Sequence, residues 1–333
     1  MRGRTTILFA LLAILCVVLF VVDVAVGSVA ISFSEVVSAL CGGGSTEIRS
    51  IVLDIRLVRG VVAVLAGMAL SVSGLQMQTL FRNPLAGPYV LGVSSGASLG
   101  VALFILGAPL FGWTSTSALS SLGVAGAAWI GSAAVLALVA SVSQRIKDIM
   151  VILILGMMIG SAVSAIVQIM QYLSNEEALK SFVVWTMGSL GDVTSSQLML
   201  VAPAILAGLG IAVAAIKPMN LMLLGEAYAR TMGLNIRRTR SLILLSTTLL
   251  AGTVTAFCGP VGFIGLAIPH LARILFQNAD HRILIPASAL TGSVALLVCD
   301  IISKLLTLPV NTVTALLGIP IVVWVVIRNK NIV

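Results

Sequence analysis

The residues that could do chemistry in this sequence are few and widely spaced. His270 stands three residues before Arg273, and His281 lies between Asp280 and Arg282. A structural zinc site takes about four ligands, and neither neighbourhood supplies them. We therefore predict hydrogen-bonded structural roles for both histidines, and neither a bound metal nor a cofactor.

The sequence signatures of nucleotide binding and hydrolysis are absent. The chain contains no G-x-x-x-x-G-K-[ST], no H-E-x-x-H and no G-x-S-x-G. It is therefore predicted neither to bind ATP through a phosphate-binding loop nor to be an enzyme.

The composition places the chain in a lipid bilayer. Its 333 residues are 59% hydrophobic and 9% charged, with a mean hydropathy of +1.17, whereas an ordinary soluble domain is about 25% charged. A soluble fold could not bury so much apolar side-chain surface. The net charge of +8 lies between apolar runs and accompanies no nucleic-acid-binding motif, so we predict no nucleic-acid partner.

Ten apolar runs approach the length of about 20 residues that crosses a bilayer core. They predict an all-α polytopic membrane protein with one transmembrane domain over residues 1–333, and with helices near residues 7–26, 57–80, 89–108, 122–142, 149–172, 198–216, 241–258, 262–277, 283–303 and 311–327. The first run resembles a secretion signal but exceeds a usual signal core, so we expect it to be retained as a helix.

The positions of Lys and Arg predict the orientation. If the N-terminus is cytoplasmic, the outside set is Arg49, Arg56, Arg59, Lys180 and Lys304, and all other basic residues, including Arg145, Lys147 and Lys330, fall inside. This bias predicts that both termini are cytoplasmic.

Two acidic residues lie near the ends of predicted spans. Asp300 is near the outer end of the ninth span, with Lys304 one turn later as an ion-pair partner, and Asp23 is near the end of the first. No span carries a central acid, which argues against coupling to a proton or sodium gradient. An ion-coupled carrier that works without an ATPase stays open as the alternative.

An internal repeat joins the two halves of the chain. The segments Leu65–Gly74 and Leu250–Gly259 share the frame LAG-x6-G, and they lie in the second and seventh spans, which run in opposite directions. This offset predicts an inverted repeat of spans 2–5 against spans 7–10, an arrangement typical of transporters.

Two polar segments interrupt the apolar pattern. Gly225–Arg240, on the predicted cytoplasmic side, holds one acid and four arginines and predicts two short helices broken at Gly233. It is either a positive-inside anchor or a docking surface. Arg82–Gly92 contains two proline breaks, which predict a re-entrant segment and a new helix near Tyr89. Pro269 is expected to kink the eighth span.

Seven motifs in order along the chain resemble the FecCD-type permeases of ABC importers for iron-siderophores, haem and vitamin B12. They are R-L-x-R (Arg56–Arg59), S-G-x-x-x-Q (Ser73–Gln78), R-N-P-L-A-x-P with L-G-V-S-S-G-A (Arg82–Ala97), the segment Gly225–Arg240, V-G-F-I-G-L-x-x-P-H-x-x-R (Val261–Arg273), D-H-R-x-L-x-P (Asp280–Pro286) and L-P-V-N-x-x-T-A-L-L-G-I-P (Leu308–Pro320).

The resemblance implies a homodimer in a bacterial inner membrane, with a separate ATPase bound to each subunit and a periplasmic binding protein that delivers the cargo. Gly225–Arg240 would be the coupling segment in the ATPase cleft. The residues that it implies for this contact are Gly225, Glu226, Ala229, Arg230, Gly233, Asn235, Arg237 and Arg238.

The same resemblance assigns Arg56, Arg59 and Lys304 to docking of the binding protein, although the family usually has Arg where Lys304 stands. Trp185–Asp192 and span five would form the gate. The remaining structural or translocation motif residues are Gln78, Arg82, Asn83, Pro84, Gly92, Gly265, Pro269, His270 and Arg273. Nothing in the sequence selects among siderophore, haem and cobalamin.

Overall fold

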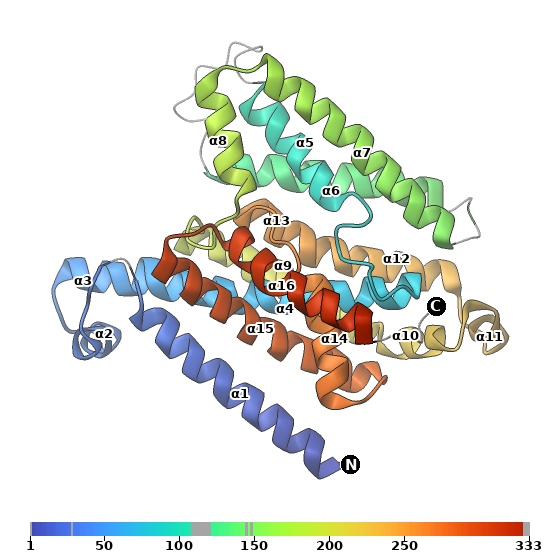
Figure 1. The fold of residues 1–333 in the computed structure, drawn as a ribbon, viewed down its shortest axis with the longest axis horizontal. Helices are drawn as coiled ribbons and strands as arrows, with labels where there is room; N and C mark the ends of the chain where they lie inside the picture. The colour runs from blue at the N-terminus through green and yellow to red at the C-terminus, as the bar shows by residue number, and fades with distance from the viewer. Residues whose placement is uncertain (1, 28, 108–120, 144–145, 147–148, 329–333) are drawn as a thin grey trace.

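A computed structural model describes residues 2–27, 29–107, 121–143, 146 and 149–328 (Figure 1), so Arg145, Lys147 and Lys330 lie outside the described residues. Within these ranges all assigned elements are helices, as predicted. The helices at the predicted spans are α1 (Arg2–Ala25), η1 (Ile51–Leu57) running into α4 (Val58–Phe81), α5 (Val93–Ile105), α6 (Ser121–Ser143), α7 (Ile149–Leu173), α9 (Ser195–Ala214), α12 (Ile236–Thr247) running through η2 (Thr248–Gly252) into α13 (Thr253–Cys258), α14 (Ile264–Phe276), α15 (His281–Leu306) and α16 (Val310–Arg328).

Short helices join these elements. They are α2 (Phe33–Leu40), α3 (Thr46–Ser50), α8 (Glu176–Thr186), α10 (Ile216–Leu223) and α11 (Glu226–Thr231). In the part of the chain that is described, 6 helices are long and apolar enough to cross a membrane, namely α1, α6, α7, α9, α12 with α13, and α15. Helices α5, α14 and α16 are apolar over shorter lengths, so the number of ten spans stays a prediction.

Helix α4 lies at the centre of the molecule, and 20 of its 24 residues are buried. Small residues allow its neighbours to approach closely. A Cβ at Gly67 would overlap the backbone of Gly292 in α15, and a Cβ at Gly74 would overlap the backbone of Gly265 in α14. The dense small residues in the sequence therefore serve helix packing at these crossings.

The packing of the two halves is reciprocal. Helix α4 packs against α14 and α15, while α13 and η2, in the seventh predicted span, pack against α5 and α6. The second span thus packs against helices of the second half, and the seventh span packs against helices of the first half. This reciprocal arrangement accords with the predicted inverted repeat. Figure 1 shows α5, α6, α7 and α8 gathered in the upper part of the view and α1 beside α15 below.

The predicted start of the third span differs from the structure. The third span does not begin near Tyr89: the chain turns there, and α5 starts at Val93 after Gly92, which has a φ of 77°. The left-handed backbone at Gly92 ends the turn, and it is a conformation that glycine adopts without a steric penalty. Tyr89 instead donates a hydrogen bond of 3.1 Å from its hydroxyl to the carbonyl of Val261.

Candidate functional site

The segment Gly225–Arg240, here called the coupling segment, folds as α11 followed by the first turns of α12. Gly225 opens it with a φ of 101° and Gly233 divides it with a φ of 82°. The N–H of Leu234 donates to the carbonyl of Ala229 at 3.0 Å, the bond that closes a helix with glycine at its end. The side chain of Asn235 then caps α12 by accepting from the N–H of Arg238 at 3.1 Å.

The prediction of two short helices broken at Gly233 is correct for the break and wrong for the second helix. Helix α12 continues to Thr247 and runs on through η2 into α13, because the residues beyond Arg240 are apolar enough to stay helical in a membrane. The second half of the coupling segment is therefore the end of a long helix.

Charge divides the coupling segment into an inner and an outer face. Glu226 forms an ion pair of 2.6 Å with Arg240, whose side chain is mostly buried. Ala229, on the inner face of α11, is fully buried. Arg230, Arg237 and Arg238 are exposed. The segment presents three guanidinium groups outward on a backbone fixed by two glycines, a cap and an ion pair.

The motif residues of Arg82–Gly92 and α14 gather beside the coupling segment. Gln78 accepts a hydrogen bond of 2.7 Å from Arg273 and donates one of 3.1 Å to the carbonyl of Leu266. The Nε2 of His270 lies 2.6 Å from the carbonyl oxygen of Pro84. The predicted hydrogen-bonded structural role of His270 is thus confirmed.

The remaining motif residues fix the turn and its packing. Asn83 accepts from the N–H of Leu85 at 2.9 Å, and a Cβ at Gly265 would lie 2.6 Å from Pro88. Arg82 ends α4 with a φ of 49°, and its guanidinium lies 3.5 Å from the position of a Cβ at Gly225. Pro269 is buried within α14. Loop, helix end and coupling segment therefore meet at one end of the bundle, here called the coupling end.

A chain of hydrogen bonds at the coupling end was not foreseen from the sequence. Asn220 of α10 donates to Asp280 at 2.6 Å and accepts from the Nδ1 of His281 at 2.7 Å. The Nε2 of His281 lies 2.8 Å from the hydroxyl of Thr79 in α4. The N–H of Arg282 and the amide of Asn220 hold the pKa of Asp280 below its usual value. Sequence separations of 60 to 202 residues hide these contacts from any local pattern.

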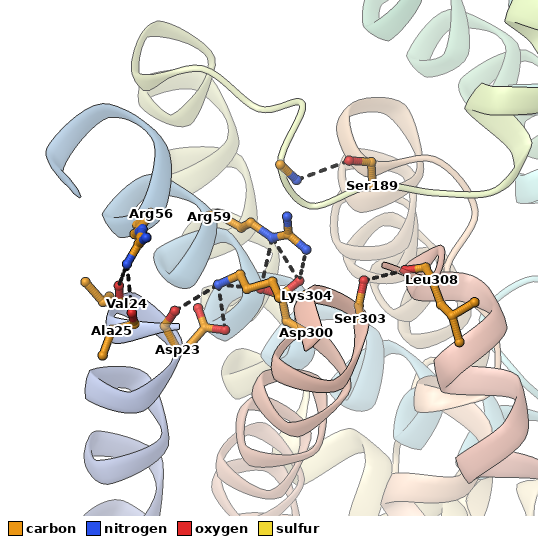
Figure 2. A network of polar contacts seen from close by, with 11 residues as sticks. Asp23, Val24, Ala25, Arg56, Arg59, Ser189, Asp300, Ser303, Lys304 and Leu308 are labelled. Atoms are coloured by element: carbon orange, nitrogen blue, oxygen red, sulfur yellow. Dashed lines mark hydrogen bonds and ion pairs between the residues drawn. The ribbon is translucent and has the colours of Figure 1, made fainter. Parts of the chain in front are cut away.

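The opposite end of the bundle, here called the far end, carries a buried charge cluster (Figure 2). Arg59 donates from Nε and Nη2 to Asp300, with distances of 2.8 to 3.0 Å. Lys304 forms ion pairs with Asp300 at 3.0 Å and with Asp23 at 2.8 Å. Both aspartate side chains are fully buried, so each carboxylate depends on its cationic neighbour.

The predicted docking residues of the far end differ in their exposure. Arg56 is buried and donates to the carbonyls of Val24, Ala25 and Val29, so it closes the end of α1. The Lys304 side chain is 5% exposed and that of Arg59 is 23% exposed. All three line one cavity of about 530 Å³, together with the turn at Gly188–Asp192. The Asp300–Lys304 pair is confirmed, whereas the partner role of Asp23 had no signal in the sequence.

Apolar helices that reach across a bilayer, joined by polar segments at two opposite ends, define the class of polytopic membrane proteins. The chain belongs to the FecCD transport family, whose model matches residues 15–328.

The chain is similar to two named bacterial permeases and to one transporter of known structure. It is 36% identical to the hemin transport system permease protein HmuU of Yersinia pestis over 99% of both chains. It is 36% identical to the vitamin B12 import system permease protein BtuC of Citrobacter koseri, over 89% of this chain and 91% of the other. A structure of an inward-facing metal-chelate type ABC transporter superposes with a TM-score of 0.84 at 29% identity, covering 97% and 99% of the two chains. The resemblance inferred from the seven motifs is confirmed.

Proposed function

We propose that this chain is the permease subunit of an ATP-driven importer, in which a separate ATPase binds the coupling segment and powers movement of a metal chelate or a tetrapyrrole into the cytoplasm. The observation that carries the proposal is the fixed backbone of the coupling segment, which presents Arg230, Arg237 and Arg238 outward. The likeness to haemin and vitamin B12 permeases supports the class of cargo.

The coupling segment has structural features that a docking surface needs and a membrane anchor does not. An anchor needs only positive charge near the membrane. Here Gly225 and Gly233 take left-handed conformations, and Glu226 is held by Arg240. A rigid protrusion transmits a displacement, which a mobile loop would absorb. Both termini and the coupling end are placed in the cytoplasm in this proposal, and the far end faces the periplasm of a bacterial inner membrane.

A polar stripe on α7 supports a homodimer with a path between its subunits. Ser161, Ser164, Gln168 and Tyr172 are exposed at helical spacing on one face of α7. Polar side chains such as Gln168 are rarely placed against lipid tails. By contrast, α1 exposes Ile14, Val17 and other apolar residues, which suit lipid. The stripe on α7 would face a second subunit and a water-containing path.

The far end would receive the periplasmic binding protein. Arg59 is the most exposed of the three predicted docking cations, and Asp300 holds its guanidinium at the wall of the cavity. An acidic side chain of a binding protein would meet Arg59 there. Arg59→Glu should weaken this docking, whereas Lys180→Glu, at an exposed site on α8, should not.

The test is reconstitution with an ABC ATPase and a substrate-binding protein from the same organism. We expect ATP-dependent uptake of one among haemin, cobalamin and a ferric siderophore in vesicles. Glu226→Arg should leave the complex assembled and abolish ATP-driven uptake while ATP hydrolysis continues, because it replaces the carboxylate that pairs with Arg230 and Arg240 by a third cation. Glu177→Arg, on exposed α8, is the matched control. A chain that binds no ATPase and transports on an ion gradient would overturn the proposal.

A further inference from the structure

Helices α4 and α15 are joined at both ends and in the middle. Arg59 binds Asp300 at the far end, and His281 meets Thr79 at the coupling end. Between them the hydroxyl of Ser293 donates to the carbonyl of Val64 at 3.0 Å. The contacts advance along α4 as they retreat along α15, so the two helices are antiparallel partners for about 30 Å.

Close packing reinforces these three contacts. Gly67 and Gly292 meet with no space for a Cβ on either, and Ser71 closes the same crossing. Interfaces of this kind have discrete arrangements and do not slide gradually. The α4–α15 pair therefore has the properties of one rigid body that extends from the far end to the coupling end.

Asn220 connects this body to the coupling segment. It lies on α10, which ends at Leu223, two residues before Gly225, and the three hydrogen bonds of its side-chain amide all go to the start of α15. Its oxygen accepts from the backbone N–H of His281 at 2.9 Å and from Nδ1 at 2.7 Å, and its nitrogen donates to Asp280. The Asn220 oxygen can only accept, so Nδ1 of His281 carries a hydrogen.

The tautomer of His281 has a consequence for Thr79. In the neutral ring with hydrogen on Nδ1, Nε2 is an acceptor, so the Thr79 hydroxyl donates to it. That hydroxyl also lies 2.9 Å from the carbonyl of Leu75 in its own helix. Thr79 thereby directs its single hydroxyl hydrogen across to α15, and the chain of donors runs unbroken from α4 to α10.

We propose that Thr79, His281 and Asn220 are positioning residues that join the coupling segment to the α4–α15 pair, so that the pair moves as one body with that segment and carries its displacement to the far end. The idea rests on the proposed function, because the displacement is supplied by the ATPase.

Amide hydrogen exchange of the permease alone tests the rigid body without any partner. Thr79→Val keeps the β-branched shape and removes the hydroxyl. We expect it to raise exchange severalfold at the C-terminal end of α15, about 30 Å away. Thr79→Ser should restore the wild-type rates. Thr291→Val, which removes a buried hydroxyl bonded within α15 itself, should act only locally. Exchange that rises only around Thr79 would overturn the proposal.

The second measurement is cargo transported per ATP hydrolysed in the reconstituted complex. Asn220→Ala and Thr79→Val should each lower this ratio about fivefold or more, since coupling between sites typically has that size. The two substitutions break one chain, so together they should be no worse than the stronger one alone. Wild-type ratios in both variants would refute the role. A wild-type chain with no ATP-driven uptake contradicts the proposed function instead. Hydrogen exchange then still tests whether α4 and α15 behave as one rigid body.

Discussion

At the scale of single residues, the far end depends on the balance of four clustered charges, three of them buried and Arg59 partly exposed. Lys304 is the cation that contacts both Asp23 and Asp300, and Arg59 contacts Asp300 alone. Lys304→Met should destabilise the folded chain by about 3–5 kcal/mol, because it leaves the Asp23 carboxylate buried without a cation. Thermal unfolding of the purified protein in detergent measures the effect.

Two variants separate charge from side-chain packing in this test. Arg49→Met removes an exposed cation and should leave the unfolding temperature unchanged. Asp23→Asn combined with Lys304→Met should recover part of the loss, since the unpaired carboxylate is gone. An unfolding temperature for Lys304→Met equal to the wild-type value would show that the cluster contributes nothing.

Asp280 makes stability depend on pH. Its pKa is lowered by hydrogen bonds from the N–H of Arg282 and from Asn220, so the folded state favours the carboxylate. The resulting stability is present above the ordinary pKa of 3.8 and is lost as the pH falls through the lowered value. Asp280→Asn keeps a residue that caps helices well and removes the charge. The wild type should be more stable at pH 7, and the difference should close below about pH 4.

Residue roles could be predicted where the partner is near in sequence. The Asp300–Lys304 pair follows from a spacing of one helical turn, and the break at Gly233 follows from glycine between polar residues. Asp23 and Lys304 are 281 residues apart in the sequence, and no local rule predicts a contact over that separation. The same limit hid the chain from Asn220 to Thr79.

At the scale of elements, the coupling segment depends on glycine at its opening. Gly225 has a φ of 101° and a ψ of 149°, a region that is essentially restricted to glycine. Gly225→Ala should cost about 1–3 kcal/mol of stability or displace α11. The same substitution at Gly210, in helical α9 with open space around it, should be neutral or stabilising by about 0.5–1 kcal/mol.

Chemical denaturation of both variants compares these two glycines, and ATPase binding reports whether α11 has moved. The expected signs are opposite. Equal effects would mean that the left-handed backbone at Gly225 is not required for the segment. The break at Gly233 was predicted correctly because glycine acts locally. The start of α5 was misplaced because the turn before Gly92 depends on contacts of Tyr89 with Thr255 in α13 and with the carbonyl of Val261.

At the scale of the whole molecule, the sequence predicts a helical membrane protein. Apolar composition and the length of apolar runs indicate a lipid environment, and this inference needs no knowledge of which helices pack together. Which helix is central is a different question. Helices α4 and α1 are similar in length, yet α4 is mostly buried and α1 mostly exposed. The glycines and serines of α4 mark the difference, since they permit close packing that Ile and Val in α1 prevent.

The exposed faces then predict how two copies of the chain meet. In a dimer with two-fold symmetry, a residue lies near its own copy only if it is close to the axis. The polar stripe on α7 belongs near that axis and the apolar face of α1 belongs in lipid. In a chain with Cys16 and Cys41 replaced by Ser, Gln168→Cys should form dimers in membranes with a short bifunctional thiol reagent. Val17→Cys, on exposed α1, should not. If Val17→Cys cross-links and Gln168→Cys does not, α1 and not α7 lies at the subunit interface. The proposed translocation path would then have to lie beside α1.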